Sequence, residues 1–100
     1  MLFIIQLIYI QPDCENVFLE FEQKAIPIIG KYNGQLLLRI RPDDHTVVEH
    51  TIEKPYEIHL VQFLTASDFE NFKQDEERKQ FLHLKEQSVR ETILIRGTAI

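Results

Sequence analysis

Residues 56–72, YEIHLVQFLTASDFENF, decide the fold of this chain. Tyr56 to Leu64 is rich in Ile, Leu, Val and Phe, which predicts a buried strand. Ser67 and Glu70 have the spacing of a capping box, so we expect a helix to begin at Asp68. The stretch therefore predicts a strand, a short polar turn and a helix in immediate succession.

Further strands are predicted on both sides of this stretch. Leu2 to Ile10 is almost wholly apolar, but it lacks the flanks of a signal peptide and is far shorter than the roughly 20 residues that span a bilayer. We interpret it as a buried strand. Gln35 to Arg41 alternates, with Leu36 and Leu38 on one face, and predicts a second strand. Thr92 to Arg96 is the last predicted strand.

Helical periodicity appears in two regions. Apolar residues at helical spacing predict a helix from Asp13 to Gly30, in which Pro27 should kink or shorten the last turn. The second helical region begins at Asp68, breaks once, and continues from Glu76 to Arg90. Residues 43–55 have the polar composition of a hairpin loop. The second helix is therefore expected in two pieces.

The element order β-α-β-β-α-β predicts a ferredoxin-like α+β fold, with a four-stranded antiparallel sheet and both helices on one face. The other face of the sheet would then expose Leu37 and, depending on register, one of the two alternating sets of apolar residues in the 56–64 strand. An apolar face of that size has to be covered. We therefore expect a homodimer.

Composition bounds the class of protein. One hundred residues, 44% of them hydrophobic, with three Gly and four Pro, make one globular domain spanning residues 1–100. The net charge of −5 argues against nucleic acid as a partner, because phosphate binding needs a concentrated basic surface. A single cysteine fits a reducing compartment, so a cytoplasmic protein without a membrane partner is expected.

The chain resembles the dimeric α+β barrel superfamily. The resemblance rests on the element order, on Glu57 to Phe63 followed by a polar turn and Asp68 to Phe72, and on Asp75 to Phe81 before the last strand. It is closest to uncharacterised small domains of that superfamily and more distant from antibiotic-biosynthesis monooxygenases. The resemblance implies two subunits packed sheet to sheet around a shared barrel. It also brings cofactor-free monooxygenase and isomerase activities into consideration.

Haem-degrading members of the superfamily share an Asn, Trp and His constellation. This chain has no Trp, has Gln6 and no Asn in its first strand, and places Phe72 closest to the position of the His. No haem or other cofactor is therefore expected.

Two arginines are candidates for binding an anionic ligand. Arg39 and Arg41 share one face of a strand, about 7 Å apart by strand rise, and two guanidinium groups at that spacing suit a carboxylate or phosphate. The alternative is that they pair across strands with Glu57 or with an acidic residue of a partner subunit. Arg96 would add to an anion site if it shares their face.

His59 stands alone in an apolar strand and is the candidate for proton transfer. The alternative is a hydrogen-bonded histidine with a structural role. Tyr56 and Gln62 are candidates to line the same cavity with hydroxyl and amide groups. No metal site is expected, since His45 and His50 are five residues apart with no cysteine nearby.

Three functional hypotheses follow. The first is a homodimer that binds a small organic molecule in the barrel or between helices and sheet. The second is a cofactor-free monooxygenase or isomerase with His59 as the base and Arg39 or Arg41 orienting an oxyanion. The third is a purely structural or interaction module. Strand register decides which of these side chains share a cavity.

Overall fold

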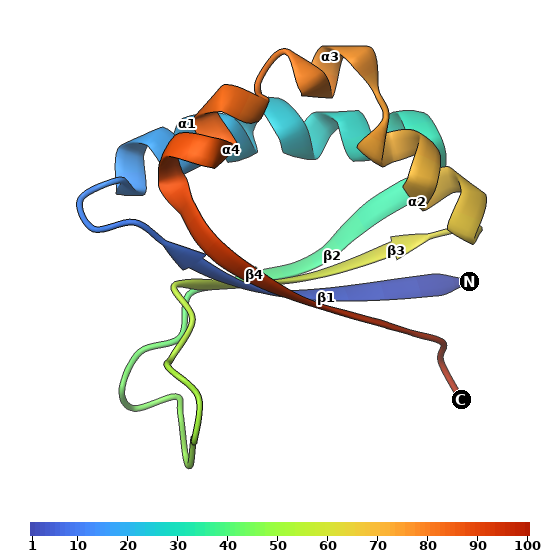
Figure 1. Ribbon diagram of the computed structural model, residues 1–100. Coiled ribbons are helices and arrows are strands. Elements are labelled where there is room, and N and C mark those ends of the chain that lie inside the picture. The colour runs from blue at the N-terminus through green and yellow to red at the C-terminus, as the bar shows by residue number, and fades with distance from the viewer.

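The computed structural model describes residues 1–100 as one antiparallel sheet with helices on a single face (Figure 1). The sheet has the strand order β2-β3-β1-β4. Its strands are β1 (Leu2–Ile10), β2 (Gly34–Ile40), β3 (Glu57–Phe63) and β4 (Val89–Gly97). This topology confirms the predicted ferredoxin-like α+β fold.

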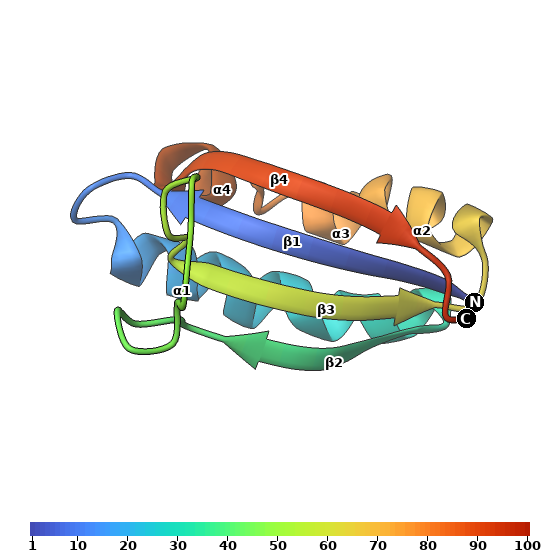
Figure 2. The same cartoon turned by 90° about the horizontal axis from the view of Figure 1, so that it is seen from below.

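The helical layer lies across the sheet in two groups (Figure 2). Its members are α1 (Glu15–Ala25), the 3₁₀ helix η1 (Ile26–Tyr32), α2 (Ala66–Lys73), α3 (Glu76–Lys79) and α4 (Leu82–Ser88). Pro27 lies in the first turn of η1, where a backbone N–H would have no partner within the helix, so the missing N–H of proline costs no hydrogen bond. The helix α1 ends before Pro27, which agrees with the predicted shortening. The predicted split of the second helix is confirmed, although the chain there forms three short helices and not two.

The start of α2 corrects the predicted helix start. Thr65 is the N-cap, with extended backbone angles of φ −137° and ψ 163°. Its side-chain oxygen accepts a hydrogen bond from the Asp68 backbone N–H at 3.1 Å, and the Asp68 carboxylate accepts one from the Thr65 N–H at 3.2 Å. The capping box is therefore Thr65 with Asp68, two residues before the predicted Ser67 with Glu70, and Ser67 already lies inside the helix.

The hydrophobic core lies between the sheet and the helices. Side chains alternate along a strand, so even-numbered residues of β1 and odd-numbered residues of β3 point toward the helical layer. One core cluster consists of Ile4, Ile28, Ile29, Val61, Phe63, Phe69 and Phe72, and a second consists of Phe21, Ala25 and Leu84. Two polar residues of β3, Glu57 and His59, are buried on the same side of the sheet.

An irregularity in β2 determines which face of the sheet Arg39 occupies. Leu36 pairs with Val61, Leu38 pairs with Leu60, and the register shifts between them. Leu36 therefore lies on the helix side and Leu38 on the open side, so the prediction that they share a face is wrong. After this bulge Arg39 lies opposite His59 on the helix side.

The open face of the sheet is apolar. It presents Phe3, Ile5, Leu7, Leu38, Ile40, Ile58, Leu60, Ile93 and Ile95. Leu38 and Ile95 are each 49% exposed, which is far above the exposure of core residues. The segment between β2 and β3 forms the predicted loop, without strand structure, and extends from the sheet on this open side (Figure 1). No helix of the chain has both the length and the apolarity needed to cross a membrane.

Candidate functional site

A buried carboxylate lies at the centre of the polar groups under the helices. Glu57, at the start of β3, is 1% exposed. Its two oxygens accept hydrogen bonds from Arg39 Nε at 2.8 Å, from Arg41 Nε at 2.9 Å and from His59 Nε2 at 2.5 Å. This is the cross-strand pairing with Glu57 that the sequence left open as the alternative for the two arginines.

The charge state of Glu57 follows from these partners. Burial by itself raises the pKa of this carboxyl, but the hydrogen bonds from His59, Arg39 and Arg41 outweigh burial and hold its pKa at about 2. Glu57 is therefore ionised at neutral pH. A charged carboxylate buried this deeply is tolerated because two guanidinium groups compensate it.

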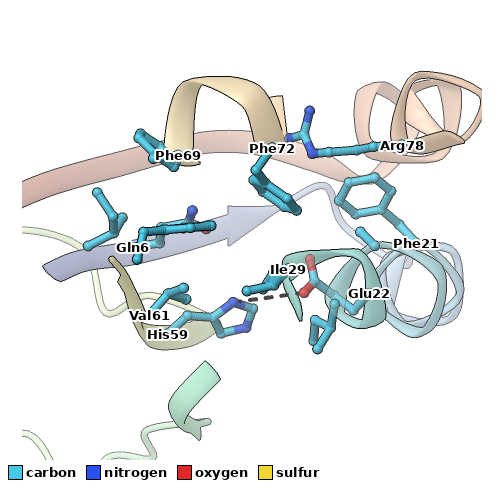
Figure 3. A pocket seen from close by; sticks show the side chains of 13 residues that line it. Gln6, Phe21, Glu22, Ile29, His59, Val61, Phe69, Phe72 and Arg78 are labelled. Atoms are coloured by element: carbon cyan, nitrogen blue, oxygen red, sulfur yellow. Dashed lines mark ion pairs between the residues drawn. The ribbon is translucent and has the colours of Figure 1, made fainter. Parts of the chain in front are cut away.

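His59 connects this carboxylate to a cavity. Its side chain is buried, with Nε2 on Glu57 and Nδ1 at 3.8 Å from Glu22 Oε2 (Figure 3). Since Glu57 is ionised and can only accept, Nε2 carries a proton and donates it in this hydrogen bond. In the neutral imidazole the lone pair is then on Nδ1, which faces Glu22. A carboxylate that orients a histidine in this way is the arrangement that general-base catalysis uses.

Glu22 is a second buried acid, on α1. It is 6% exposed, and no hydrogen bond satisfies its carboxyl group. Burial raises its pKa and the Glu57 charge raises it further, while His59, Arg39 and Arg78 lower it by less than burial raises it. The two carboxyl groups flanking His59 thus have their pKa values displaced in opposite directions, as acid and base pairs at functional sites do.

A cavity of about 60 Å³ lies beside His59, which is room for about two water molecules. It adjoins a hollow of about 210 Å³ between β1, β4 and the helices. The two share the lining residues Gln6, Phe21, Glu22, Phe69, Phe72 and Arg78. In Figure 3 the aromatic rings of α1 and α2 form one side and the polar groups of Gln6, Glu22 and His59 lie toward the other. We refer to both spaces together as the helix–sheet cleft.

Ligand atoms of Glu22, Glu57 and His59 lie within 4.8 Å of one another, which is a spacing that a metal ion can use. The chemistry of the donors does not fit a metal well, because both oxygens of Glu57 accept hydrogen bonds from guanidinium groups. Arg39 and Arg41 already supply the positive charge that a metal ion would bring.

The structure brings three of the six predicted site residues together. Arg39, Arg41 and His59 meet at Glu57, as described above. Tyr56 lies at the margin of this group, with the Arg41 guanidinium 5.2 Å from its ring centroid and its ring nearly perpendicular to that of Phe18. It lines a separate surface hollow outside the helix–sheet cleft.

Two predicted site residues lie elsewhere. Gln62 pairs with Phe3 and Gln35 and points to the open face, because its neighbours Val61 and Phe63 point to the helices. Arg96 is on the helix side of β4, at the opposite edge of the sheet from Arg39. Its guanidinium lies 3.8 Å from Glu70 and 5.4 Å from the Phe69 ring centroid.

Sequence reasoning missed four residues of the cleft: Gln6, Glu22, Arg78 and Lys85. The signal for Glu22 was present, since it follows Phe18 by four residues and precedes Ala25 by three, on the apolar stripe of the helix. Gln6 interrupts an otherwise apolar run in the same way. Arg78 and Lys85 carried no such signal, because their positions depend on how the three short helices pack.

The chain was compared with known proteins. No protein-family model matches it, and no curated protein matches its sequence. Solved structures with the same fold do match over the whole chain. One is a protein of unknown function from Rhodopseudomonas palustris, with a TM-score of 0.83 at 11% identity, covering 99% of this chain and 82% of that one.

Two further structures are similar. An uncharacterised NIPSNAP domain protein from Burkholderia xenovorans has a TM-score of 0.75 at 14% identity, covering 100% of this chain and 95% of that one. A putative antibiotic biosynthesis monooxygenase from Nitrosomonas europaea has a TM-score of 0.75 at 12% identity, covering 100% and 99%. The chain is thus a ferredoxin-like α+β protein that resembles NIPSNAP and antibiotic-biosynthesis-monooxygenase structures in fold. At these identities the likeness extends to the fold alone.

Proposed function

We propose that this protein is a homodimer that binds a small organic molecule in the helix–sheet cleft. The observation that carries the proposal is the composition of the cleft, in which aromatic walls surround a few convergent polar groups. Phe21, Phe69 and Phe72 supply the apolar surface, while Gln6 and Glu22 supply polar atoms. Pockets for small molecules have this make-up.

The size of the cleft limits the ligand. Its larger part is about 210 Å³, below the roughly 300 Å³ at which typical small-molecule pockets begin. We therefore expect a molecule with about one ring. The polar groups around His59 would contact one end of it, and the rings of Phe21 and Phe72 would contact its body.

The homodimer is proposed from the open face of the sheet. Nine apolar side chains from all four strands lie on this face, and Ile5, Leu38 and Ile95 are substantially exposed in the single subunit. A second copy offers a matching apolar face, which is the arrangement implied by the resemblance to the dimeric α+β barrel superfamily. Packing of the two faces would bury this surface and leave the helix–sheet cleft of each subunit free.

Ligand binding can be tested by thermal denaturation with a panel of single-ring compounds, charged and neutral. We expect at least one to raise Tm by about 4 °C or more at roughly ten times its Kd. Leu94 lines the larger hollow and is 42% exposed, so Leu94→Trp should fill the hollow and abolish the shift. Leu64→Trp is the matched control, because Leu64 is 53% exposed and lies outside the cleft. An unchanged shift in Leu94→Trp, or no shift with any compound, contradicts the proposal.

A second candidate function is an enzyme of the cofactor-free monooxygenase or isomerase type. The observation that favours it is the orientation of His59, whose Nε2 is fixed by ionised Glu57 while Nδ1 faces the cleft. In this function Nδ1 would take a proton from an acidic carbon of the substrate and leave an enolate. The guanidinium of Arg78, which lines the same cavity as His59, would stabilise the enolate oxygen.

This second candidate is tested by hydrogen–deuterium exchange of a carbon acid with a single ring, such as phenylacetone in D2O. We expect the wild-type protein to accelerate exchange at the carbon next to the carbonyl, and His59→Gln to abolish that acceleration while still binding the compound. Equal exchange rates for wild-type protein and His59→Gln contradict an enzymatic role and leave the binding function in place.

A further inference from the structure

Two cations line the larger hollow of the cleft without partners of opposite charge. Arg78, on α3, has its Nε buried and without a hydrogen-bond partner. Its Nη1 reaches the Lys73 carbonyl oxygen at 3.4 Å, and its guanidinium lies 5.1 Å from the Phe72 ring centroid. Lys85, on α4, lines the same hollow. Neither Arg78 nor Lys85 takes part in an ion pair.

The electrostatics of the hollow are unbalanced. Burial lowers the pKa of Arg78 more than the nearby Glu22 and Asp75 raise it. Burial and the Arg78 charge lower the pKa of Lys85 more than Glu22 and Glu86 raise it. The two side chains therefore repel each other in a partly dehydrated space. The only acid in the lining is Glu22, and burial favours its neutral form. No acidic group lies at ion-pair distance from either cation in this part of the cleft.

The backbone around Arg78 is held in place. Asp75 caps α3, with its carboxylate accepting a hydrogen bond from the Arg78 backbone N–H at 2.7 Å. The same carboxylate accepts one from the Tyr32 hydroxyl at 2.5 Å, which ties α3 to η1. Arg78 is thus positioned before any ligand binds, which reduces the entropy lost on binding.

We propose that the ligand of the helix–sheet cleft is a small organic carboxylate, with its carboxylate group between Arg78 and Lys85. This inference rests on the proposed function and specifies its ligand class. A guanidinium with free donors and an ammonium suit a carboxylate group. Phe18, Phe21 and Phe72 surround the space where its apolar body lies, and the far end of the molecule points toward Gln6 and His59.

A single negative charge on an apolar body fits this lining better than a phosphate group. The hollow has seven hydrophobic residues among its thirteen, so most of the ligand surface meets carbon atoms. Burying a doubly charged group there would cost more desolvation than the two cations return.

The test compares acids with their amides on the full-length protein by calorimetry. The probes are benzoate, phenylacetate and 3-phenylpropanoate, each paired with the corresponding neutral amide of nearly the same shape. We expect at least one carboxylate to bind about tenfold or more tightly than its amide, since the amide cannot form the charge-assisted hydrogen bonds. Raising the salt concentration should weaken binding of the carboxylate and leave binding of the amide unchanged.

Single substitutions test which side chains bind the carboxylate group of the ligand. Arg78→Gln and Lys85→Gln should each weaken binding of the carboxylate about tenfold and leave binding of the amide unchanged. Lys79→Gln removes the same charge from an exposed neighbour that pairs with Glu76, and it should have little effect. Circular dichroism and Tm establish that each variant is folded.

The outcomes separate the ligand class from the function. If an amide binds as tightly as its acid, or if Lys79→Gln weakens the acid as much as Arg78→Gln does, the carboxylate assignment is overturned while binding in the cleft stands. If no acid, amide or other compound of the panel binds at millimolar concentration, both the assignment and the proposed binding function are overturned.

Discussion

At the scale of single residues, Glu57 dominates the electrostatics of the molecule. Its carboxylate is buried, charged and bonded to two arginines and a histidine, and its pKa is about 2. In the unfolded chain a glutamate titrates near 4.3. Folding therefore favours the ionised form of Glu57, and the stability this contributes is present above the unfolded pKa and lost as pH falls toward 2.

We predict that acid destabilises the wild-type protein through this residue. The pKa difference corresponds to roughly 3 kcal/mol of unfolding free energy, lost between about pH 5 and pH 2. Urea unfolding across this pH range measures it. Glu57→Gln should be less stable at pH 7, because it leaves Arg39 and Arg41 without their counter-charge, and should lose much less stability with acid. Parallel pH profiles for the two proteins contradict this account of Glu57.

Glu22 is predicted to act in the opposite sense. Burial raises its folded pKa, so folding favours the neutral carboxyl. Its contribution to stability is present below the unfolded pKa of about 4.3 and is lost as pH rises from there through the raised folded value. Glu22→Gln should therefore be more stable than the wild-type protein at pH 7, with the difference vanishing near pH 3. The same urea series measures this, and a Glu22→Gln variant that is less stable at pH 7 contradicts it.

At the scale of secondary-structure elements, the capping of α2 provides a matched test. Thr65→Ala should cost about 1 kcal/mol of unfolding free energy, because Thr65 is the N-cap and forms the reciprocal pair with Asp68. Ser67→Ala should change stability by less than about 0.5 kcal/mol, since Ser67 is exposed within the helix. Chemical denaturation of the two variants compares them directly. A larger loss for Ser67→Ala would restore the capping box read from the sequence.

The elements that the sequence predicts well are those with long, uniform patterns. Leu2 to Ile10 is a continuous apolar run and forms β1 over that range. The start of α2 was placed wrongly because Thr65 with Asp68 and Ser67 with Glu70 share one spacing, and only backbone geometry distinguishes them. The bulge in β2 was missed because alternation cannot reveal where a strand gains a residue.

The same distinction applies to the site. His59 was identified because a titratable residue in an apolar strand is conspicuous, and Arg39 was correctly paired with Glu57 as one of two options. Gln62 and Arg96 were misplaced relative to the cleft, because face and strand order depend on register and topology. The position of Arg78 depends on how the short helix α3 packs against the rest of the chain, and no local sequence pattern predicts that packing.

At the scale of the whole molecule, the apolar open face of the sheet predicts the state of assembly. The wild-type protein should sediment at micromolar concentration with twice the chain mass of 11.9 kDa. Ile5→Glu places a charge in the middle of this face and should yield a monomer, whereas Val48→Glu, at a loop residue that is 99% exposed, should not. Analytical ultracentrifugation measures all three. A wild-type monomer at these concentrations contradicts the dimer.

The helix–sheet cleft and the open face are on opposite sides of the sheet, so the proposed assembly and the proposed ligand binding would use separate surfaces. The most direct test of the central claim is nuclear magnetic resonance mapping of a bound single-ring compound on the isotopically labelled protein. Binding in the cleft predicts shift changes at Gln6, Glu22, Phe72 and Arg78. Shift changes confined to open-face residues such as Ile5 and Ile95, or none with any compound of the panel, would contradict it.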